Sequence, residues 1–352
     1  YSRMKKKIII LFFYFGIIAL SFVSLKPKSI NFIIPKGWPK VVYDFSKNTL
    51  TEDGVELGRH LFYDPILSRD STISCASCHL QAVGFTHVDH DLSHGIEDKI
   101  GTRNSLALMN LAWSKNFMWD GGVNHLDVQP LAPITSKVEM DESIENIVRK
   151  LNSGSKYKSL FKRAFSDSNV TGQKTLLAIS QFVLQLNSYN SKYDKYIRKE
   201  AGGEFTEQEK NGLRLFRKSC SSCHTEPLFT NNDFMNNGLP LDTILKDFGR
   251  YNTTKNSKDS LKFKVPTLRN IEFSYPYMHD GRFKKLFQVL NHYSSDLTKS
   301  KTLAKELQVP IALTSNEKVD IVAFLLTLTD KSFLSNPKLS YPKTFFSKAT
   351  KE

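Results

Sequence analysis

Apolar side chains recur at helical spacing in several stretches of the chain. In the first half, one such stripe consists of Leu177, Ile179, Phe182 and Leu186. Alternating strand patterns are scarce, and long loops containing Asn, Gly and Ser separate the periodic stretches. The pattern predicts a mainly α protein with long loops, in which the apolar stripes form the core.

Two further stripes follow signals for the start of a helix. Thr206 with Glu209 and Thr314 with Glu317 both fit the capping-box pattern, in which a Thr or Ser precedes a Glu or Gln by three residues. The apolar residues that follow are Leu213 and Phe216 after the first box, and Val319, Val322 and Leu326 after the second. We therefore expect two more helices, each with its stripe in the core.

The length of the chain favours two domains. Its 352 residues exceed what one compact core usually holds, and Gly202-Gly203 makes a suitable linker between the halves. We expect an N-terminal domain over residues 40–200 and a C-terminal domain over residues 203–335. Residues 336–352 form a tail with prolines among lysines and serines, which either wraps the surface or is disordered.

The N-terminus has the pattern of an export signal. Lys5–Lys7 precede Ile8–Val23, a mostly apolar run that is shorter than the ~20 residues of a membrane-spanning helix. Ala19-Leu20-Ser21 resembles a cleavage site, so residues 1–21 are predicted to be a signal peptide. An uncleaved membrane anchor is the alternative. In either case we expect the body of the protein in the periplasm.

The composition and charge add little to this picture. Hydrophobic residues make up 40% of the chain and charged residues 24%, as in ordinary globular proteins. The formal net charge of +14 indicates either a solvated basic surface or a docking face for an acidic partner. Nucleic acid is not expected as a partner, because the lysines are scattered and no binding motif accompanies them.

All four cysteines lie in two copies of one motif, Cys-x-x-Cys-His. The first copy contains Cys75, Cys78 and His79, and the second contains Cys220, Cys223 and His224. This is the attachment signature of c-type haem, whose vinyl groups bond the two thiols and whose iron takes the histidine. Disulfides or a zinc site are the alternatives, but each pair is followed directly by histidine and nothing indicates that the pairs converge. We therefore predict two covalent haem c groups.

Further segments resemble the bacterial dihaem cytochrome c peroxidases and their MauG-type relatives. The similarity runs from Leu57 to Leu328. Beside the haem motifs it rests on the segments Leu57–Pro65, Gly101–Asn104, Trp119–Gly121, Gln129–Glu139, Val265–Asn270 and Tyr275–Gly281. The resemblance implies two cytochrome c-like haem domains with long loops, and it implies that peroxide is reduced at the N-terminal haem.

The resemblance also implies roles for four residues around that haem. Glu139 matches the family's catalytic glutamate, which takes a proton from peroxide and delivers it to the leaving oxygen. Gln129 lies ten residues before Glu139, as the family pattern requires, and Pro133 shapes the pocket. Trp119 matches the tryptophan between the two haems, where an indole can relay an electron. A plain core tryptophan is the alternative.

A calcium site between the domains is implied as well. Asn104 precedes Trp119 by fifteen residues and matches the family's calcium-binding asparagine. The other protein ligands would be the backbone carbonyls of Ser274 and Pro276, and carbonyl oxygens suit a hard cation. The family usually has threonine at the position of Ser274, a change that a carbonyl ligand tolerates.

The sixth ligand of the N-terminal haem is left open. The loop after the first motif carries His87, His90 and His94, and in many of the peroxidases one loop histidine binds the iron until the other haem is reduced. His94 is nearest to that position, but its register is off by at least one residue. All three are also compatible with solvated loop histidines.

The sixth ligand of the C-terminal haem is expected to be Tyr293. It lies fourteen residues after His279, where many of the peroxidases have methionine and the MauG-type relatives have tyrosine. His292 is adjacent and could compete, whereas Met278 fills an apolar family position and is rejected. A phenolate ligand favours ferric iron and is expected to lower the potential.

These expectations lead to one function and two alternatives. The first is a cytochrome c peroxidase that reduces hydrogen peroxide with electrons from a small cytochrome c or cupredoxin. The second is a MauG-like enzyme that oxidises side chains of a partner protein, which Tyr293 favours. The third is an electron carrier, against which Glu139 and Gln129 count because a carrier needs no acid–base pair. Formation of a homodimer is left open.

Overall fold

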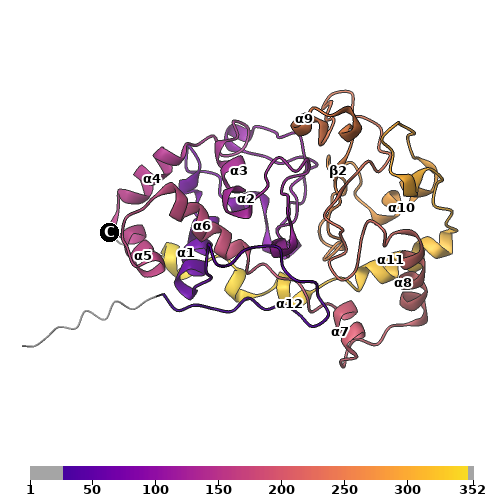
Figure 1. Ribbon diagram of the computed structural model, residues 1–352, viewed down its shortest axis with the longest axis horizontal. Helices are drawn as coiled ribbons and strands as arrows, with labels where there is room; N and C mark the ends of the chain where they lie inside the picture. Colours follow the sequence, from indigo (N-terminus) through magenta and orange to yellow (C-terminus); the bar gives the residue numbers. More distant parts are fainter. Residues whose placement is uncertain (1–26, 348–352) are drawn as a thin grey trace, which may run out of the picture.

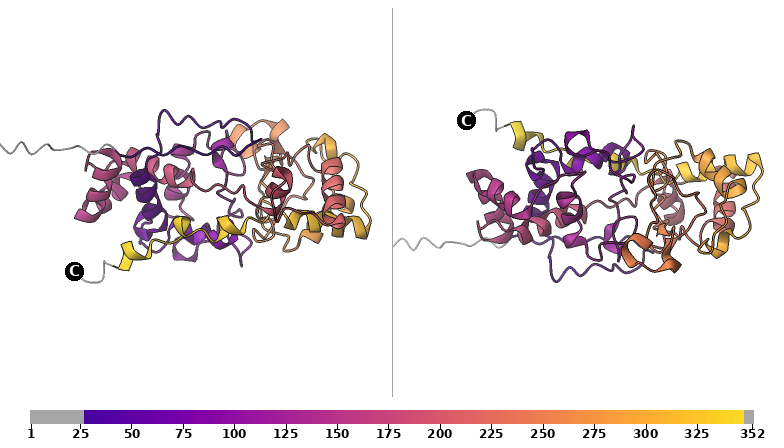
Figure 2. Two further views of the ribbon diagram at one scale, coloured as in Figure 1. Left: turned by 90° about the horizontal axis from the view of Figure 1, so that it is seen from below. Right: turned by 90° about the horizontal axis from the view of Figure 1, so that it is seen from above.

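The computed structural model describes residues 27–347 and shows two helical lobes lying side by side (Figure 1). The same arrangement is visible from below and from above (Figure 2). The predicted mainly α architecture is confirmed, because the regular elements are helices apart from two short strands within the described residues. The predicted signal peptide, residues 1–21, lies outside these residues.

The helices divide into three groups along the chain. The N-terminal lobe contains α1 (Glu52–Tyr63), α2 (Cys75–Cys78), α3 (Leu131–Thr135), α4 (Ile144–Asn152), α5 (Ser155–Phe165) and α6 (Gly172–Val183). The C-terminal lobe contains α7 (Lys192–Arg198), α8 (Glu207–Ser219), α9 (Tyr251–Thr254), α10 (Leu286–Ser295) and α11 (Ser315–Leu326). The last two helices are α12 (Lys331–Leu334) and α13 (Lys343–Ser347).

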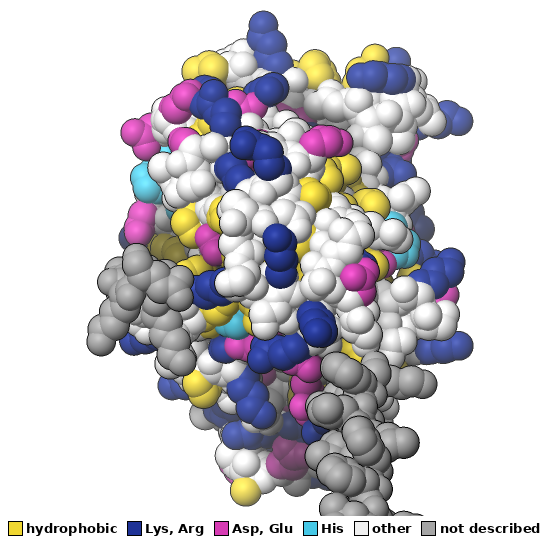
Figure 3. Space-filling view, turned by 90° about the vertical axis from the view of Figure 1, so that its left-hand side faces the viewer, with side chains coloured by type: hydrophobic (Ala, Val, Ile, Leu, Met, Phe, Trp, Pro, Cys, Tyr) yellow, Lys and Arg dark blue, Asp and Glu magenta, His cyan; other side chains and the backbone are white. Residues whose placement is uncertain are grey.

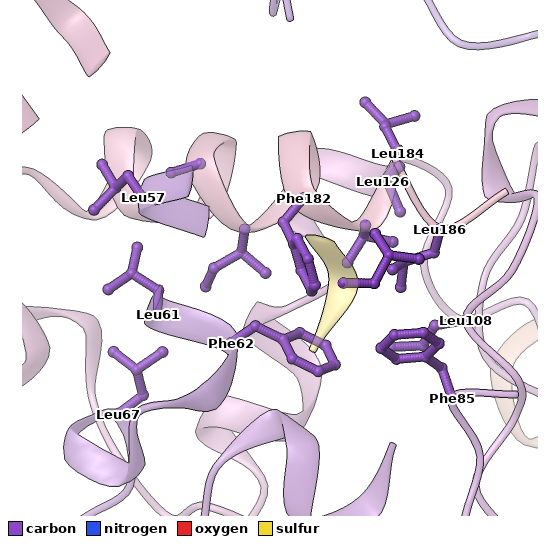
Figure 4. Close-up of a cluster of buried hydrophobic side chains, with 14 of the residues drawn as sticks. Leu57, Leu61, Phe62, Leu67, Phe85, Leu108, Leu126, Phe182, Leu184 and Leu186 are labelled. Atoms are coloured by element: carbon purple, nitrogen blue, oxygen red, sulfur yellow. The ribbon is translucent and has the colours of Figure 1, made fainter. Parts of the chain in front are cut away.

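The core of the N-terminal lobe forms where α1 packs against α6 (Figure 4). The close approach depends on Gly58 of α1, since a Cβ atom there would lie 1.9 Å from the Ala178 carbonyl oxygen. The rings of Phe62 and Phe182 then meet with their centroids 5.1 Å apart. The predicted stripe is therefore largely correct, although Leu186 is buried beyond the end of the helix.

The core of the C-terminal lobe forms where α8 packs against α11. Both helices begin with the predicted capping box: Thr206 accepts from the Glu209 backbone N–H, and Thr314 accepts from the Glu317 backbone N–H. Gly212 of α8 allows the contact, because a Cβ atom there would lie 2.0 Å from the carbonyl oxygen of Asp320. The two predicted helix starts are confirmed.

The predicted core stripe of α11 is wrong in part. Val319 is 50% exposed and Leu326 is 42% exposed, and only Val322 packs partly against the core. The face that packs on α8 carries Ile321, Phe324 and Leu325 instead. The helix is apolar on more than one side, so the spacing of its apolar residues does not determine which side is buried.

The two strands form one small antiparallel pair in the C-terminal lobe. They are β1 (Phe234–Met235) and β2 (Phe263–Lys264), with Phe234 opposite Lys264 and Met235 opposite Phe263. The backbone N–H of Lys264 also donates to the carbonyl of Trp119, 2.7 Å away, in the other lobe. The strand pair therefore connects the C-terminal lobe to the N-terminal lobe through a backbone hydrogen bond.

Residues 331–347, which we call the C-terminal strap, return from the C-terminal lobe to the N-terminal lobe (Figure 1). Phe333 and Leu339 are buried in the N-terminal core. Further along, the ring of Phe345 stacks on His60 of α1 with a centroid separation of 3.7 Å. The N-terminal lobe thus takes part of its core from the end of the chain.

One group of ion pairs joins the two lobes, and another stabilises the interior of the C-terminal lobe. Arg103 donates to Asp120 and, through two nitrogens, to Asp247 of the other lobe, at 2.6–2.9 Å. The fully buried Arg269 donates to both carboxylate oxygens of Asp194 at 2.8 and 2.9 Å. Such buried pairs hold geometry firmly, because loss of one partner leaves an uncompensated charge.

Two features concern the surroundings of the protein: the length of its apolar helices and the charges on its surface. No helix within residues 27–347 is long and apolar enough to cross a membrane, and the apolar run Ile8–Val23 lies outside the described residues. At the end of the molecule formed by the N-terminal lobe, lysine and arginine side chains are interspersed with aspartate and glutamate (Figure 3). This face therefore carries charges of both signs.

Candidate functional site

Each Cys-x-x-Cys-His motif lines its own internal cavity. The first cavity, of about 320 Å³, is bordered by Cys75, Cys78 and His79. The second, of about 210 Å³, is bordered by Cys220, Cys223 and His224. The structure therefore separates the two motifs into two sites, one in each lobe.

The first motif forms a single helical turn. Ser74 and Ser77 cap α2 reciprocally, and the His79 backbone N–H donates to the Cys75 carbonyl at 3.0 Å. The ring Nδ1 of His79 lies 2.9 Å from the Phe85 carbonyl, which can only accept, so Nδ1 carries the proton. Nε2 is left with a free lone pair, as a metal ligand requires.

The second motif repeats this geometry at the end of α8. The His224 backbone N–H donates to the Cys220 carbonyl at 2.9 Å, and Nδ1 of the ring donates to the Phe229 carbonyl at 3.1 Å. Burial lowers the pKa of both His79 and His224 to about 4, although the hydrogen bonds to the carbonyls oppose this. Both imidazoles are therefore neutral and able to bind iron.

The four cysteines are partly buried free thiols at the edges of the two cavities. Burial raises the pKa of Cys75 and of Cys220 to about 12. Within residues 27–347, no group of three or more His, Cys, Asp and Glu side chains converges in a way that could hold a metal ion. A zinc site built from the two pairs is thus disfavoured, whereas paired thiols beside a cavity and an imidazole nitrogen fit covalent haem.

The residues expected on the peroxide side gather around the first cavity. Glu139, Gln129 and Pro133 all line it. Burial raises the pKa of the Glu139 carboxyl above its usual value, although a hydrogen bond from Ser136 opposes the shift. The structure thus brings a carboxyl that holds its proton more tightly than usual into the cavity of His79.

Local packing fixes the backbone at Glu139. The Ile96 backbone N–H donates to the Glu139 carbonyl at 2.8 Å. Gly95 allows this approach, because a Cβ atom there would lie 2.5 Å from the Cα of Glu139. The loop after the first motif therefore holds the glutamate in place.

Trp119 lies in the wall between the cavities and lines both. It is 8% exposed, and its indole N–H donates to the carbonyl of Asn104 at 2.8 Å. Two backbone segments also border both cavities, residues 104–107 and 264–267. The wall is consequently built from both halves of the chain, and the indole is held within it by the bond to Asn104.

Asn104 reaches across this wall to the expected calcium ligands. Its Nδ2 lies 2.5 Å from the Pro276 carbonyl, while its buried Oδ1 has no hydrogen-bond partner. Rotating the amide by half a turn would exchange the two atoms and bring its oxygen beside the Pro276 carbonyl oxygen. That arrangement fits a hard cation. Ser274 borders the second cavity close by.

Only one of the three loop histidines borders the first cavity. His94 lines it, whereas His87 and His90 do not. The three rings follow one another along the loop, with centroids 5.3 Å apart between His87 and His90 and 4.3 Å between His90 and His94. The candidates for an additional ligand thus reduce to His94.

The second cavity contains Tyr293, as the sequence predicted, but also Met278. Burial raises the pKa of the Tyr293 phenol to about 12, and a hydrogen bond from the Asn237 amide opposes the shift. The Sδ of Met278 lies 3.4 Å from the Nδ2 of Asn237. His292 points elsewhere, since its Nε2 donates to the Asn237 carbonyl at 2.9 Å. Of the sixth ligands considered from the sequence, Tyr293 and Met278 thus line this cavity.

The sequence analysis missed Lys264, which is buried and lines both cavities. Lysine is usually a surface residue, so nothing in the composition drew attention to it. The signal that could have revealed it is its position directly before the segment Val265–Asn270, which borders both cavities over much of its length.

Comparisons with known proteins agree with this geometry. The family model of di-haem cytochrome c peroxidase matches residues 52–202. The methylamine utilization protein MauG of Methylorubrum extorquens is 33% identical over 301 residues, covering 82% of each chain. The cytochrome c551 peroxidase of Nitrosomonas europaea is 34% identical over 281 residues, covering 79% of this chain and 80% of the relative.

A solved structure is similar over the whole fold. The crystal structure of a MauG-like protein associated with microbial copper homeostasis superposes with a TM-score of 0.83 and 31% sequence identity. The match covers 90% of this chain and all of the other. Both lobes therefore have counterparts in a known structure.

Proposed function

Because the chain belongs to the di-haem cytochrome c peroxidase family, we propose that it reduces hydrogen peroxide to water in the cavity of His79. The balanced reaction takes one peroxide, two protons and two electrons to two waters. The observation that carries the proposal is the presence of Glu139 and Gln129 in the same cavity as the neutral histidine of the first motif, His79.

The family carries two c-type haems, and we assign one to each cavity and to each of the expected domains, residues 40–200 and 203–335. When bound, the haems would supply the redox chemistry of iron for peroxide reduction. His79 and His224 would each bind iron through Nε2, and Tyr293 would provide a further ligand in the second cavity. The paired thiols would hold the haems covalently.

Glu139 serves the proton transfers. As a carboxylate it takes a proton from one peroxide oxygen, and as a carboxylic acid it returns that proton to the departing oxygen. Because burial raises the pKa of this carboxyl, its protonated form is reached more easily than that of an ordinary glutamate. Gln129 can hold the peroxide through its amide, and Pro133 limits the shape of the cavity.

Electrons are proposed to enter at the C-terminal lobe from a small cytochrome c or cupredoxin and to cross the wall near Trp119. The contact of this indole with both cavities supports the path. Calcium is proposed to join the lobes through Asn104 and the carbonyls of Ser274 and Pro276, which the unpartnered Oδ1 supports. The predicted export signal supports a periplasmic location, where c-type haem proteins meet such donors.

A MauG-like activity on a partner protein is the second candidate. The observation in its favour is Tyr293, which borders the second cavity where many peroxidases of the family have methionine. Isolation of a partner protein carrying an oxidised side chain after incubation with the enzyme and peroxide would establish this activity.

Steady-state turnover of peroxide with reduced cytochrome c tests the main proposal. We expect turnover by the wild-type protein and a loss of ~100-fold or more in Glu139→Gln, because an amide cannot transfer the proton. Glu145→Gln, which changes an exposed glutamate of α4, is the matched control and should retain full activity. Equal rates for wild type and Glu139→Gln would place the acid–base residue elsewhere.

A further inference from the structure

Lys264 is a buried cation without a carboxylate partner. It is 7% exposed, and its Nζ donates to the Asn116 carbonyl at 2.6 Å and to the Ser114 hydroxyl at 3.2 Å. Both partners are neutral. Among residues 27–347, no aspartate or glutamate forms an ion pair with it.

This situation is unusual for a folded protein. The other buried lysine or arginine of the described residues, Arg269, is paired with Asp194 through two hydrogen bonds. A buried ammonium group without a counter-charge is costly, and burial alone lowers the pKa of Lys264 to about 8. A site that keeps such a group points to an anion that the polypeptide does not itself supply.

The position of Lys264 indicates which anion this is. The residue lines both cavities, in the wall that Trp119 also shares. Each haem carries two propionate carboxylates, which need a counter-charge when they are buried. We propose that Lys264 is the counter-charge of a haem propionate in this wall and thereby raises the potential of the haem that it contacts. The proposal rests on the proposed binding of haem in both cavities.

The physical effect follows from the charge of the iron. Ferric iron carries one more positive charge than ferrous iron, so a nearby ammonium group disfavours the ferric form. Lys264 also contacts the loop that contains Trp119. Its backbone N–H donates to the Trp119 carbonyl, and its side chain donates to residues 114 and 116 of the same loop. It is therefore a positioning residue for Trp119 as well as a source of charge.

The test compares three variants of the holoprotein by haem content and by spectropotentiometric titration. Lys264→Met removes the charge, Lys264→Arg retains it, and Lys262→Met changes a nearby lysine that pairs with Asp259 on the same segment. We expect two haems in each variant. In Lys264→Met, the ratio of reduced to oxidised form of one haem at a fixed potential should fall about tenfold, which equals 59 mV for one electron.

The controls separate charge from structure. Lys264→Arg should keep the wild-type potentials, and Lys262→Met should leave them unchanged. Lys264→Gln keeps a hydrogen-bond donor but loses the charge, so it should lower the potential as Lys264→Met does, whereas a purely structural role would leave the potential of Lys264→Gln unchanged. The haem whose potential moves identifies whether the propionate belongs to the first or the second cavity. If Lys264→Met does not fold, Lys264→Gln removes the charge while keeping a donor for Asn116.

The outcomes also distinguish this inference from the proposed function. If the wild-type protein binds two haems and their potentials are unchanged in Lys264→Met and Lys264→Gln, as in the control Lys262→Met, the proposed role of Lys264 is overturned. The proposed function is not affected by that result. Wild-type protein with fewer than two covalent haems overturns the proposed function, and this inference with it.

Discussion

At the scale of single residues, hydrogen bonds determine which nitrogen of each histidine ring is free to bind a metal. His79 and His224 use Nδ1 to bind a backbone carbonyl, which leaves Nε2 free beside a cavity. His292 uses Nε2 itself for the Asn237 carbonyl and is withdrawn from the second cavity. The backbone around each ring therefore decides which imidazoles can bind iron.

The raised pKa of Glu139 predicts a pH dependence of peroxide reduction. The group must be deprotonated to take the first proton, so kcat/KM for peroxide should fall as the pH drops through the pKa of the free enzyme. Because burial raises that pKa, the fall should begin at a higher pH than for an ordinary glutamate. A pH profile of kcat/KM with reduced cytochrome c measures this.

The same profile in Glu139→Gln serves as its control. The acidic limb should disappear from the residual activity, and it should persist in Glu145→Gln. An unchanged limb in Glu139→Gln would assign the titration to another group.

In Tyr293→Met, we expect the midpoint potential of the C-terminal haem to rise. A phenolate is a hard anionic ligand that favours ferric iron, whereas a thioether favours ferrous iron. The substitution places a thioether in a cavity that already contains Met278, so Met278→Leu serves as a second variant. Spectropotentiometry should show a higher potential in Tyr293→Met and little change in Met278→Leu. A shift confined to Met278→Leu would make methionine the ligand.

The residue scale also shows how far the sequence alone can lead. The haem motifs could be identified because their chemistry is local, with all ligating atoms of one motif within five consecutive residues. Lys264 could not, because its burial and its lack of a carboxylate partner arise from contacts with a loop about 150 residues earlier in the chain. For the same reason, the sequence could not select His94 from the three loop histidines.

At the scale of elements, helix starts were easier to predict than buried faces. A capping box involves four neighbouring residues, and both predicted boxes are present. The buried side of α11 depends on where Gly212 lets α8 approach, which involves a residue about 110 positions away. Because the helix has apolar residues on more than one side, spacing alone favoured Val319 and Leu326 incorrectly.

Neighbouring leucines of α11 provide a test of this orientation. Leu325 is 5% exposed and Leu326 is 42% exposed. Leu325→Ala should lower the free energy of unfolding by about 2–4 kcal/mol through lost burial and a cavity, whereas Leu326→Ala should change it by less than about 1 kcal/mol. Denaturant unfolding followed by circular dichroism measures both. The reverse order would mean that the stripe predicted from the sequence faces the core.

At the scale of the whole molecule, the site depends on how the lobes meet. Segments from both halves build the wall between the cavities, and Arg103 bridges from one lobe to Asp247 in the other. A small rotation of one lobe would therefore change both cavities at once. The sequence could suggest two domains but could not describe this shared wall, since no single segment contains it.

Removal of calcium is expected to loosen this arrangement. Asn104 and the Pro276 carbonyl come from different lobes, so a cation between them would hold the lobes together. Chelation should lower peroxide turnover, and added Ca²⁺ should restore it. Asn104→Leu should have the same low activity with or without chelator. Fully active protein in which metal analysis finds no calcium would contradict the site.

The C-terminal strap has a consequence for how the protein is made. A chain leaves the ribosome from its N-terminus, and domains commonly fold in that order. Here Phe333 and Leu339, which belong to the core of the first lobe, emerge after the whole second lobe. The first lobe therefore cannot complete its core until the end of the chain arrives, so the cavity beside Cys75 and Cys78 stays incompletely packed until then.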